Sequence, residues 1–150
     1  IARGLTMLVS QILKTKADDS VTTVSPSMLI SEAAKLLSEK RIGTLVISSD
    51  GKRPDGILSE RDIVRALGQQ GGGCLNKTVE ALMTSKLITC AKNERADDIL
   101  AKMTEGRFRH MPVLEDGALI GLISLGDVVK ARLMELSMEK DALQGMIMGH

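Results

Sequence analysis

The segment GILSERDIV at residues 56–64 decides the fold, because GLISLGDVV repeats it 65 positions later, at residues 121–129. The likeness continues upstream at an offset of 66, where TVSP at residues 23–26 matches TCAK at residues 89–92. Self-similarity at a nearly fixed spacing indicates two copies of one supersecondary unit. The predicted organisation is a first repeat at residues 8–70, a glycine-rich linker at 71–78, a second repeat at 79–134 and a C-terminal helix extension at 135–150.

Both copies show the same order of elements. A short helix is followed by an extended segment, an amphipathic helix, two strands joined by an Asp-Gly turn, and a last helix. The expected ranges are 9–13, 21–24, 30–40, 42–48 and 56–58 in the first copy, and 79–83, 88–90, 96–106, 108–114 and 119–123 in the second. The last helices should start at Glu60 and Leu125, and Gly68 should end the first of them. This order of elements predicts a mixed α/β (α+β) fold. The glycine-rich residues 68–74 predict a flexible connection between the two copies.

The second final helix is much longer than its counterpart in the first copy. Apolar residues continue along it almost to the C-terminus. One interpretation is that they cover the repeat to which the helix belongs, and the other is that they dock on a second subunit. We favour the second interpretation, and therefore a homodimer, because an uncovered apolar face would otherwise be left in water.

Composition argues against several classes of function. The 150 residues carry 20 Lys+Arg and 19 Asp+Glu, and a net charge of +1 gives no global field to hold a nucleic acid duplex. Phe108 is the single aromatic residue, so single strands find no stacking platform. No apolar run approaches the roughly 20 residues that span a membrane. Cys74 and Cys90 cannot form a disulfide framework, which favours a reduced, cytoplasmic protein.

Motifs of catalysis and metal binding do not occur in the sequence. There is no HExxH, no GxSxG and no phosphate loop, and the histidines are His110 and His150. Cys74 has no base near it in sequence, and Cys90 lies in an apolar context that favours packing. We therefore expect a protein that is not an enzyme and that requires no metal.

The sharpest local feature is a Ser-x-x-Asp motif where a strand turns into a helix, at residues 59–62 and again at 124–127. One interpretation is structural, since Ser and Asp at this spacing form a capping box. The other is functional, because a helix N-terminus suits phosphate and a carboxylate can accept both hydroxyls of a ribose. Gly56 and Gly121 would let a ligand approach the backbone. The two interpretations do not exclude one another.

The segment RFRHMPV at residues 107–113 offers a second candidate. Period-two alternation places Arg107 and Arg109 on one face of a strand and His110 on the other. These charges could simply discourage aggregation at a strand edge. Alternatively, Arg109 and His110 reach a phosphate, and Arg61 at the start of the first final helix does the same.

The ordered set of motifs, present twice, resembles the cystathionine-β-synthase (CBS) domain over residues 8–134. No output domain is attached, so the chain is similar to stand-alone tandem CBS pairs. The resemblance implies repeats packed with pseudo-two-fold symmetry, two clefts between them and a flat homodimer. It also implies a regulatory sensor of adenosine-containing ligands that acts on an unknown downstream protein. AMP is the favoured ligand, with ADP, ATP, NAD(H) and S-adenosylmethionine as alternatives, and an interaction protein without a small-molecule ligand is the competing hypothesis.

The resemblance also implies roles for individual residues. Aspartates would hold ribose hydroxyls, serines would contact ribose or phosphate, the first extended segment and the first strand would line the base, and cations would neutralise phosphate. The implied residues are Thr23, Val24, Thr44, Leu45, Val46, Ser59, Arg61 and Asp62 in the first copy, and Thr89, Cys90, Arg109, His110, Met111, Pro112, Ser124 and Asp127 in the second.

The two copies differ at positions that matter for charge. Gly43 and Thr44 stand where the second copy has Arg109 and His110. Gly126 stands where the first copy has Arg61. Two unequal sites are therefore expected. The site that combines Asp62 and Arg61 with the cations of the second copy should be the stronger one.

Overall fold

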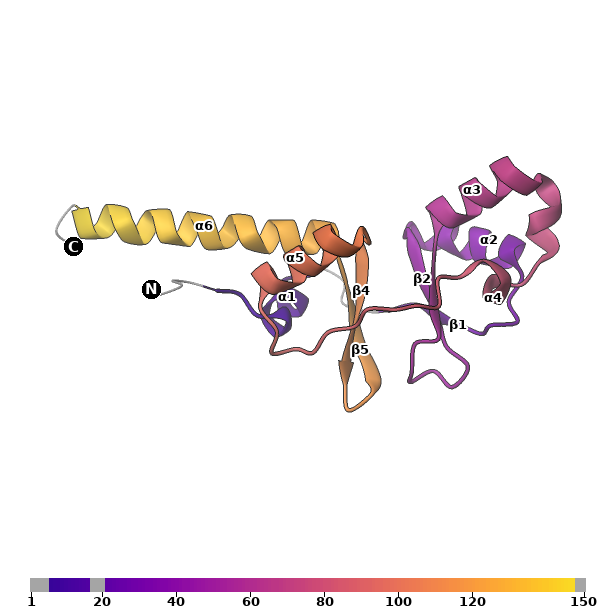
Figure 1. Cartoon of the computed structure of the whole chain (residues 1–150), viewed down its shortest axis with the longest axis horizontal. Coiled ribbons are helices and arrows are strands. Elements are labelled where there is room, and N and C mark those ends of the chain that lie inside the picture. The colour runs from indigo at the N-terminus through magenta and orange to yellow at the C-terminus, as the bar shows by residue number, and fades with distance from the viewer. Residues whose placement is uncertain (1–5, 17–20, 148–150) are drawn as a thin grey trace. The chain divides into compact units, whose positions relative to one another are not determined.

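The computed structural model describes residues 6–16 and 21–147, which form two compact units (Figure 1). Unit 1 contains residues 6–16, 89–115 and 120–147, and unit 2 contains residues 21–88 and 116–119. Each unit holds the strands and longer helices of one repeat together with the short helix that opens the other repeat. The expected mixed α/β fold and the long C-terminal helix are confirmed. The pseudo-two-fold packing of the repeats stays a prediction.

Unit 2 is built on a three-stranded sheet in the order β1-β2-β3, in which β1 and β2 are parallel and β2 and β3 antiparallel. Its elements are β1 (Thr23–Val24), α2 (Ile30–Lys40), β2 (Thr44–Ile47), β3 (Gly56–Ser59), α3 (Glu60–Gln70) and α4 (Val79–Leu82). The register pairs Thr23 with Val46 and Thr44 with Ser59. The sheet thereby brings six of the expected site residues onto neighbouring strands.

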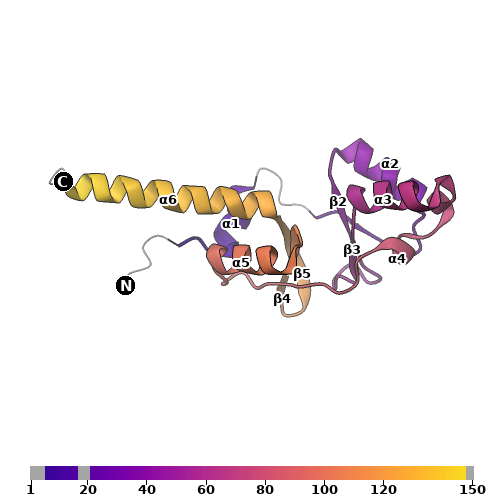
Figure 2. The same ribbon diagram turned by 45° about the horizontal axis from the view of Figure 1, so that its top comes forward.

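The core of unit 2 explains why these segments form these elements. Helices α2 and α3 lie side by side in Figure 2. The residues at helical spacing on α2 are Ile30, Ala33 and Leu37, which are at most 5% exposed. They pack in one cluster with Leu45 and Leu58 from the strands. The predicted apolar face of α2, with its bounds, is therefore confirmed.

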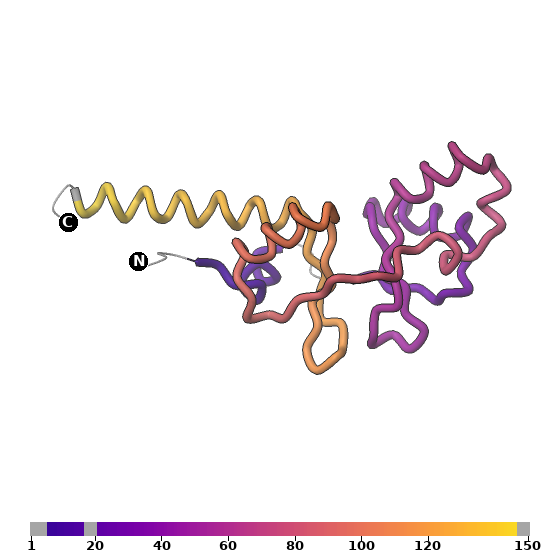
Figure 3. Tube along the Cα trace, viewed as in Figure 1, coloured from indigo at the N-terminus to yellow at the C-terminus, as the bar shows by residue number. Residues whose placement is uncertain are grey.

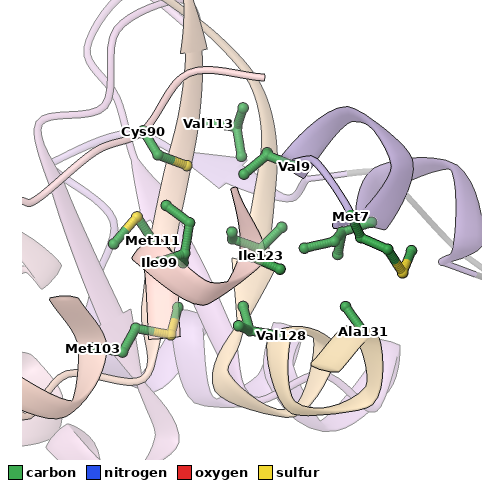
Figure 4. Close-up of a cluster of buried hydrophobic side chains, with 12 residues drawn as sticks. Met7, Val9, Cys90, Ile99, Met103, Met111, Val113, Ile123, Val128 and Ala131 are labelled. Atoms are coloured by element: carbon green, nitrogen blue, oxygen red, sulfur yellow. The ribbon is translucent and has the colours of Figure 1, made fainter. Parts of the chain in front are cut away.

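Unit 1 repeats this arrangement with a hairpin in place of the three-stranded sheet. Its elements are α1 (Val9–Thr15), α5 (Ala96–Gly106), β4 (His110–Glu115), β5 (Ala118–Ser124) and α6 (Leu125–Ile147), although the first two residues of β5 group with unit 2. The close-up in Figure 4 shows Ile99 and Met103 from α5 meeting Met111 and Ile123 from the strands in its buried cluster. Cys90 makes a parallel bridge to Val113 where unit 2 has the strand β1, so the extended segment expected at 88–90 shortens to a single bridge.

The two short helices dock in equivalent ways. The backbone N–H of Val9 donates to the Glu94 carbonyl at 2.9 Å, and that of Val79 donates to the Met28 carbonyl at 2.8 Å. Met28 and Glu94 are counterparts at the offset of 66. Each unit therefore receives its short helix at the same place in its repeat.

The glycine-rich stretch is ordered, so the prediction of a flexible connection is wrong. Helix α3 continues through Gly68 to Gln70, and Gly71 supplies the positive φ of 75° that the helix end needs. A short 3₁₀ helix, η1 (Gly72–Asn76), follows. Cys74 is fully buried, and its packing pins the segment against the unit.

Both hairpins are present, but the Asp-Gly turn is tight in the second copy alone: Asp50 and Gly51 lie within the longer connection 48–55 between β2 and β3, and of this pair Gly51 alone has a positive φ, 76°. Asp116 and Gly117 have φ values of 52° and 80°, the left-handed pair that suits a tight turn. Arg107 departs from the expectation of a strand residue. It ends α5 with a φ of 56°, as Arg41 ends α2 with a φ of 53°, and β4 begins only at His110.

Candidate functional site

The Ser-x-x-Asp motif forms a capping box in both units. The backbone N–H of Ser59 donates to Asp62 Oδ2 at 2.9 Å, and that of Asp62 donates to Ser59 Oγ at 3.3 Å. The corresponding bonds of Ser124 and Asp127 measure 2.8 and 3.1 Å. The structural interpretation of the motif is therefore confirmed. A second role in ligand binding stays a prediction.

In both units, the first N–H group of the final helix also donates to a backbone carbonyl of the same unit. The N–H of Glu60 donates to the Gly43 carbonyl at 2.9 Å, and the N–H of Leu125 donates to the Arg109 carbonyl at 2.7 Å. Together with the capping box, these bonds occupy N–H groups that a helix N-terminus would otherwise present to an anion. The helix ends offer phosphate fewer free donors than the sequence argument assumed.

The two aspartates differ in their cationic partners. Asp127 Oδ2 lies 3.0 Å from Lys16 Nζ, which also donates to the Leu122 carbonyl at 2.7 Å. Asp62 has a weaker partner, since Arg65 Nη1 is 3.9 Å from its Oδ1 and the Arg65 side chain is 67% exposed. Surface pairs of this kind contribute little. The two carboxylates are similarly exposed, 25% for Asp127 and 22% for Asp62, and the Ser59 hydroxyl also donates to Asp62 Oδ2 at 3.0 Å. The units therefore differ in the cation: a lysine holds Asp127 closely, whereas Asp62 has only a long pairing with Arg65.

The pKa of the Asp127 carboxyl reflects this environment. Burial favours its neutral form, but the N–H of Ser124 and the ammonium of Lys16 stabilise the carboxylate and outweigh that effect. The pKa of Asp127 is therefore held below its ordinary value. Asp127 is ionised at neutral pH, with Lys16 as its counter-ion.

Gly56 and Gly121 admit protein side chains close to the backbone. A Cβ at Gly56 would lie 2.7 Å from Met83 Cγ, and one at Gly121 would lie 2.7 Å from Leu13 Cδ2. Met83 follows α4 directly and Leu13 lies on α1, so the short helices fill the space. The glycines are explained by packing, whereas the sequence argument assigned that space to a ligand.

The strand residues divide between core and opposite face. Leu45 and Met111 are fully buried members of the two core clusters. Alternation along a strand places Val46 and Pro112 on the opposite face. Val46 and Pro112 are buried as well, but they lie outside the two core clusters that contain Leu45 and Met111.

The cationic candidates lie at the edges of the units. Arg61 is exposed on the first turn of α3, where it lines an open hollow of about 460 Å³ with Glu60, Val64 and Arg65. Arg109 is exposed just before β4, and His110 is half-buried at its first position. Each of these side chains is placed where it could meet an anionic group.

The cysteines have a packing role in this structure. Burial raises the pKa of the Cys90 thiol to about 12, with Glu94 adding to the effect. Cys74 is fully buried as well. Cys90 is 4% exposed within the core cluster of unit 1, which confirms the expectation that it is a packing residue.

The sixteen expected site residues fall into two sets of eight, one in each unit. Thr23 and Val24 on β1 lie beside β2, and the Ser59–Asp62 turn lies beside Thr44. Thr89 and Cys90 lie beside β4 in unit 1. Sequence reasoning missed Lys16, although the match between residues 9–14 and 79–84, extended by two positions, pairs it with Lys86.

Two negative findings complete the description of the site. Among residues 6–16 and 21–147, no group of three or more His, Cys, Asp or Glu side chains is placed to hold a metal ion. Within the same part of the chain, no helix combines the length and the hydropathy that a bilayer crossing requires.

Comparison with known proteins gives the family. The CBS domain model matches twice, at residues 9–69 and 79–134. The CBS-domain containing protein ATU1752 from Agrobacterium tumefaciens is 43% identical, with a TM-score of 0.78 over 84% of this chain and 99% of that chain.

Two further crystal structures contain ligands. The CBS domain protein PAE2072 from Pyrobaculum aerophilum, complexed with AMP, is 28% identical, with a TM-score of 0.73 over 88% of this chain and 99% of that one. The CBS domain pair of protein MJ0100, in complex with 5′-methylthioadenosine and S-adenosyl-L-methionine, is 30% identical, with a TM-score of 0.72 over 84% and 95%. The chain described here belongs to the CBS domain family and carries two copies of the domain.

Proposed function

We propose that this chain is a non-catalytic regulatory module that binds adenosine-containing nucleotides at its two strand-to-helix turns. The observation that carries the proposal is that each unit has an aspartate carboxylate at a strand-to-helix turn. The two turns, Ser59–Asp62 and Ser124–Asp127, have the same pair of capping hydrogen bonds. Relatives of the same family bind AMP, 5′-methylthioadenosine and S-adenosyl-L-methionine. A carboxylate at such a turn can accept both hydroxyls of a ribose.

The turn of unit 2 should be the stronger site. In Asp62, Oδ2 accepts the N–H and the hydroxyl of Ser59, while Arg65 lies 3.9 Å from Oδ1, so a ribose meets little competition from a cation. Asp127 is already bonded to Lys16 at 3.0 Å, and a ribose would have to displace or share that ammonium. Arg61, exposed beside Asp62, adds a cation for phosphate, whereas Gly126 stands at the equivalent position of unit 1.

The remaining contacts follow from the strands. Thr23 and Thr89 would contact the base, beside Val46 and Pro112, which are buried outside the two core clusters. Arg109 and His110 would meet phosphate. AMP is the favoured ligand, and ADP, ATP, NAD(H) and S-adenosylmethionine are the alternatives. No metal is required for this mode of binding.

Regulation would proceed by a shift of population. A nucleotide that prefers one state of the chain favours that state, and a downstream protein reads it. We further propose that the chain works as a cytoplasmic homodimer. The competing function is an interaction protein without a small-molecule ligand, in which both aspartates serve as helix caps alone.

The test is a thermal-unfolding screen of the full chain with AMP, ADP, ATP, NAD⁺, NADH and S-adenosylmethionine. A ligand at about 100 times its dissociation constant adds about 2.7 kcal/mol to the stability of the folded state, which raises the melting temperature measurably. The variant that replaces both Asp62 and Asp127 by Asn should lose this response. Asparagine keeps one capping oxygen for the serine N–H but cannot present two carboxylate oxygens to a ribose diol.

The matched control is Asp98→Asn, which removes an exposed carboxylate on α5 and should respond to nucleotide as the unmodified chain does. Circular dichroism establishes that all three proteins fold. Absence of a shift with every ligand, or an undiminished shift in the double variant, would contradict the proposed site. The first of these outcomes would favour the interaction protein.

A further inference from the structure

Helix α6 carries a row of large apolar side chains that its own unit leaves uncovered. Leu133, Leu136 and Leu143 are 63, 53 and 59% exposed, and Val129 is 40% exposed. The same helix packs on its unit through a different face, on which Val128, Ala131 and Glu135 are at most 2% exposed. The helix therefore has two apolar faces, and one of them is unpartnered.

The spacing of the exposed row follows a heptad repeat. Residues 129, 133, 136, 140 and 143 are separated alternately by four and three positions. In heptad notation Leu133 and Lys140 occupy a positions, and Val129, Leu136 and Leu143 occupy d positions. We call these five residues the α6 seam. At 1.5 Å per residue the seam runs about 21 Å along the helix.

The fold leaves room for a second helix along the seam. Helix α6 contacts α5 and α1 of its own unit. In Figures 1 and 2, and along the trace in Figure 3, its later part continues beyond both of these helices. Leu143 and Met146, 59 and 74% exposed, lie on this projecting part. A 3-4 spaced row on a projecting helix is the geometry of a two-stranded coiled coil.

We propose that the α6 seam pairs with the α6 seam of a second copy of this chain in a parallel, in-register coiled coil. This inference rests on the homodimer proposed above but not on the nucleotide site. The charges on and beside the α6 seam indicate which helix pairs with it. Lys140 is the charged member of the seam, and Glu139 precedes it at the flanking g position. In a parallel pair, each g residue borders the a residue that follows it on the other helix.

Glu139 of one copy therefore lies next to Lys140 of the other, twice in the symmetric pair. An apolar segment of another kind would leave the Lys140 ammonium against a hydrophobic surface without a counter-charge, which costs free energy. A lysine at a single a position also favours one register and a small number of strands. Self-pairing is the arrangement that satisfies both the apolar row and its charge.

The first test measures the mass of the full chain by sedimentation equilibrium over a range of concentrations. The unmodified chain should be a dimer, and Leu136→Glu should weaken the dimer about a hundredfold or more, since two buried leucines are lost per pair. The matched control, Ala142→Glu, adds the same charge at an exposed position of α6 outside the seam. It should leave the dimer unchanged.

The second test establishes orientation and partner. In a parallel, in-register pair the two copies of residue 136 face each other, so Leu136→Cys should form an intermolecular disulfide on oxidation. Ala142→Cys should not, and the two native cysteines are buried. A monomeric unmodified chain, or a dimer that survives Leu136→Glu, overturns the proposal. Nucleotide binding measured on the same Leu136→Glu protein shows whether the nucleotide site stands or fails independently.

Discussion

The two units are formed by two copies of one repeated sequence, yet the equivalent carboxylates, Asp62 and Asp127, have different cationic partners. In unit 1, Lys16 reaches Asp127 at 3.0 Å, whereas in unit 2 Asp62 pairs with Arg65 at 3.9 Å. The capping boxes are alike, so the local fold does not depend on this difference. Two repeats can therefore keep the same architecture while a segment packed against one of them changes the ion pairing of a single carboxylate.

The largest contrast between the units concerns a buried acid. Glu135 on α6 is 1% exposed and accepts the N–H of Met7 at 2.6 Å, with Arg132 also bonded to it. Glu135→Ala should cost about 2–4 kcal/mol of unfolding free energy, because it leaves a buried N–H without its acceptor. Its counterpart in unit 2 is the exposed Gln70. Gln70→Ala should change stability by less than about 0.5 kcal/mol in the same denaturant titration.

An equal loss of unfolding free energy in Glu135→Ala and Gln70→Ala would contradict this contrast between the units. Glu135→Gln serves as the conservative control. It keeps an oxygen for Met7 and removes the charge that pairs with Arg132, so it should fall between the two alanine variants.

A second contrast separates the two glycines. A methyl group at Gly56 would meet Met83 Sδ most closely, and it would also crowd Met83 Cγ and Cβ, 2.7 and 3.1 Å away, which have less freedom to move. At Gly121 the closest atom is the end of the Leu13 side chain, which can turn aside. Gly56→Ala should therefore lower the free energy of unfolding by about 1–3 kcal/mol, as measured by chemical denaturation. Gly121→Ala should lower it by less. Adding Met83→Ala to Gly56→Ala should recover part of the loss, and no recovery would exclude this contact as the cause.

Much of the fold was predictable because its signals are local. The bounds of α2 and α5 follow from apolar residues at helical spacing, and the starts of α3 and α6 follow from the Ser-x-x-Asp capping box. The Asp-Gly turns carry their own backbone requirement. These predictions depend on residues a few positions apart, so one sequence suffices for them.

The errors arose where the answer depends on distant packing. The glycine-rich linker looks flexible by composition, but burial of Cys74 orders it. Leu45 and Met111 look like a wall for a base, yet the pleat of their strands turns them into the cores. Lys16 was missed because its bond to Asp127 joins two segments 111 positions apart in the chain.

A double-mutant cycle sharpens the comparison of the two aspartates. Lys16 and Asp127 are both about three-quarters buried at the side chain, so their coupling should be about 0.5–1 kcal/mol. Arg65 and Asp62 should couple by less than about 0.3 kcal/mol, given the exposure of Arg65. The four single and two double alanine variants, unfolded in denaturant, give both values. Equal couplings would mean that the two carboxylates are held alike.

The pH dependence of the Asp127 contribution is the smallest expected effect. Its pKa is lower in the folded chain than in the unfolded one, so the unfolded chain takes up a proton first as the pH falls. The stability that Asp127 adds should be complete above the ordinary aspartate pKa of about 4 and should disappear as the pH falls through the lower folded value. The difference in unfolding free energy between the unmodified chain and Asp127→Asn, followed from neutral to acid pH, measures it. A difference that grew on acidification would contradict the assigned direction.

The most direct measurement is a calorimetric titration of the full chain with AMP, compared among the unmodified chain, Asp62→Asn and Asp127→Asn. The account predicts that Asp62→Asn weakens the tightest binding event about tenfold or more, which corresponds to about 1.4 kcal/mol, while Asp127→Asn leaves that event nearly unchanged. Lys16→Ala should strengthen the weaker event, since it frees the Asp127 carboxylate. Loss of the tightest event in Asp127→Asn with retention in Asp62→Asn would contradict the claim that the carboxylate of unit 2, which no lysine holds closely, makes the stronger site.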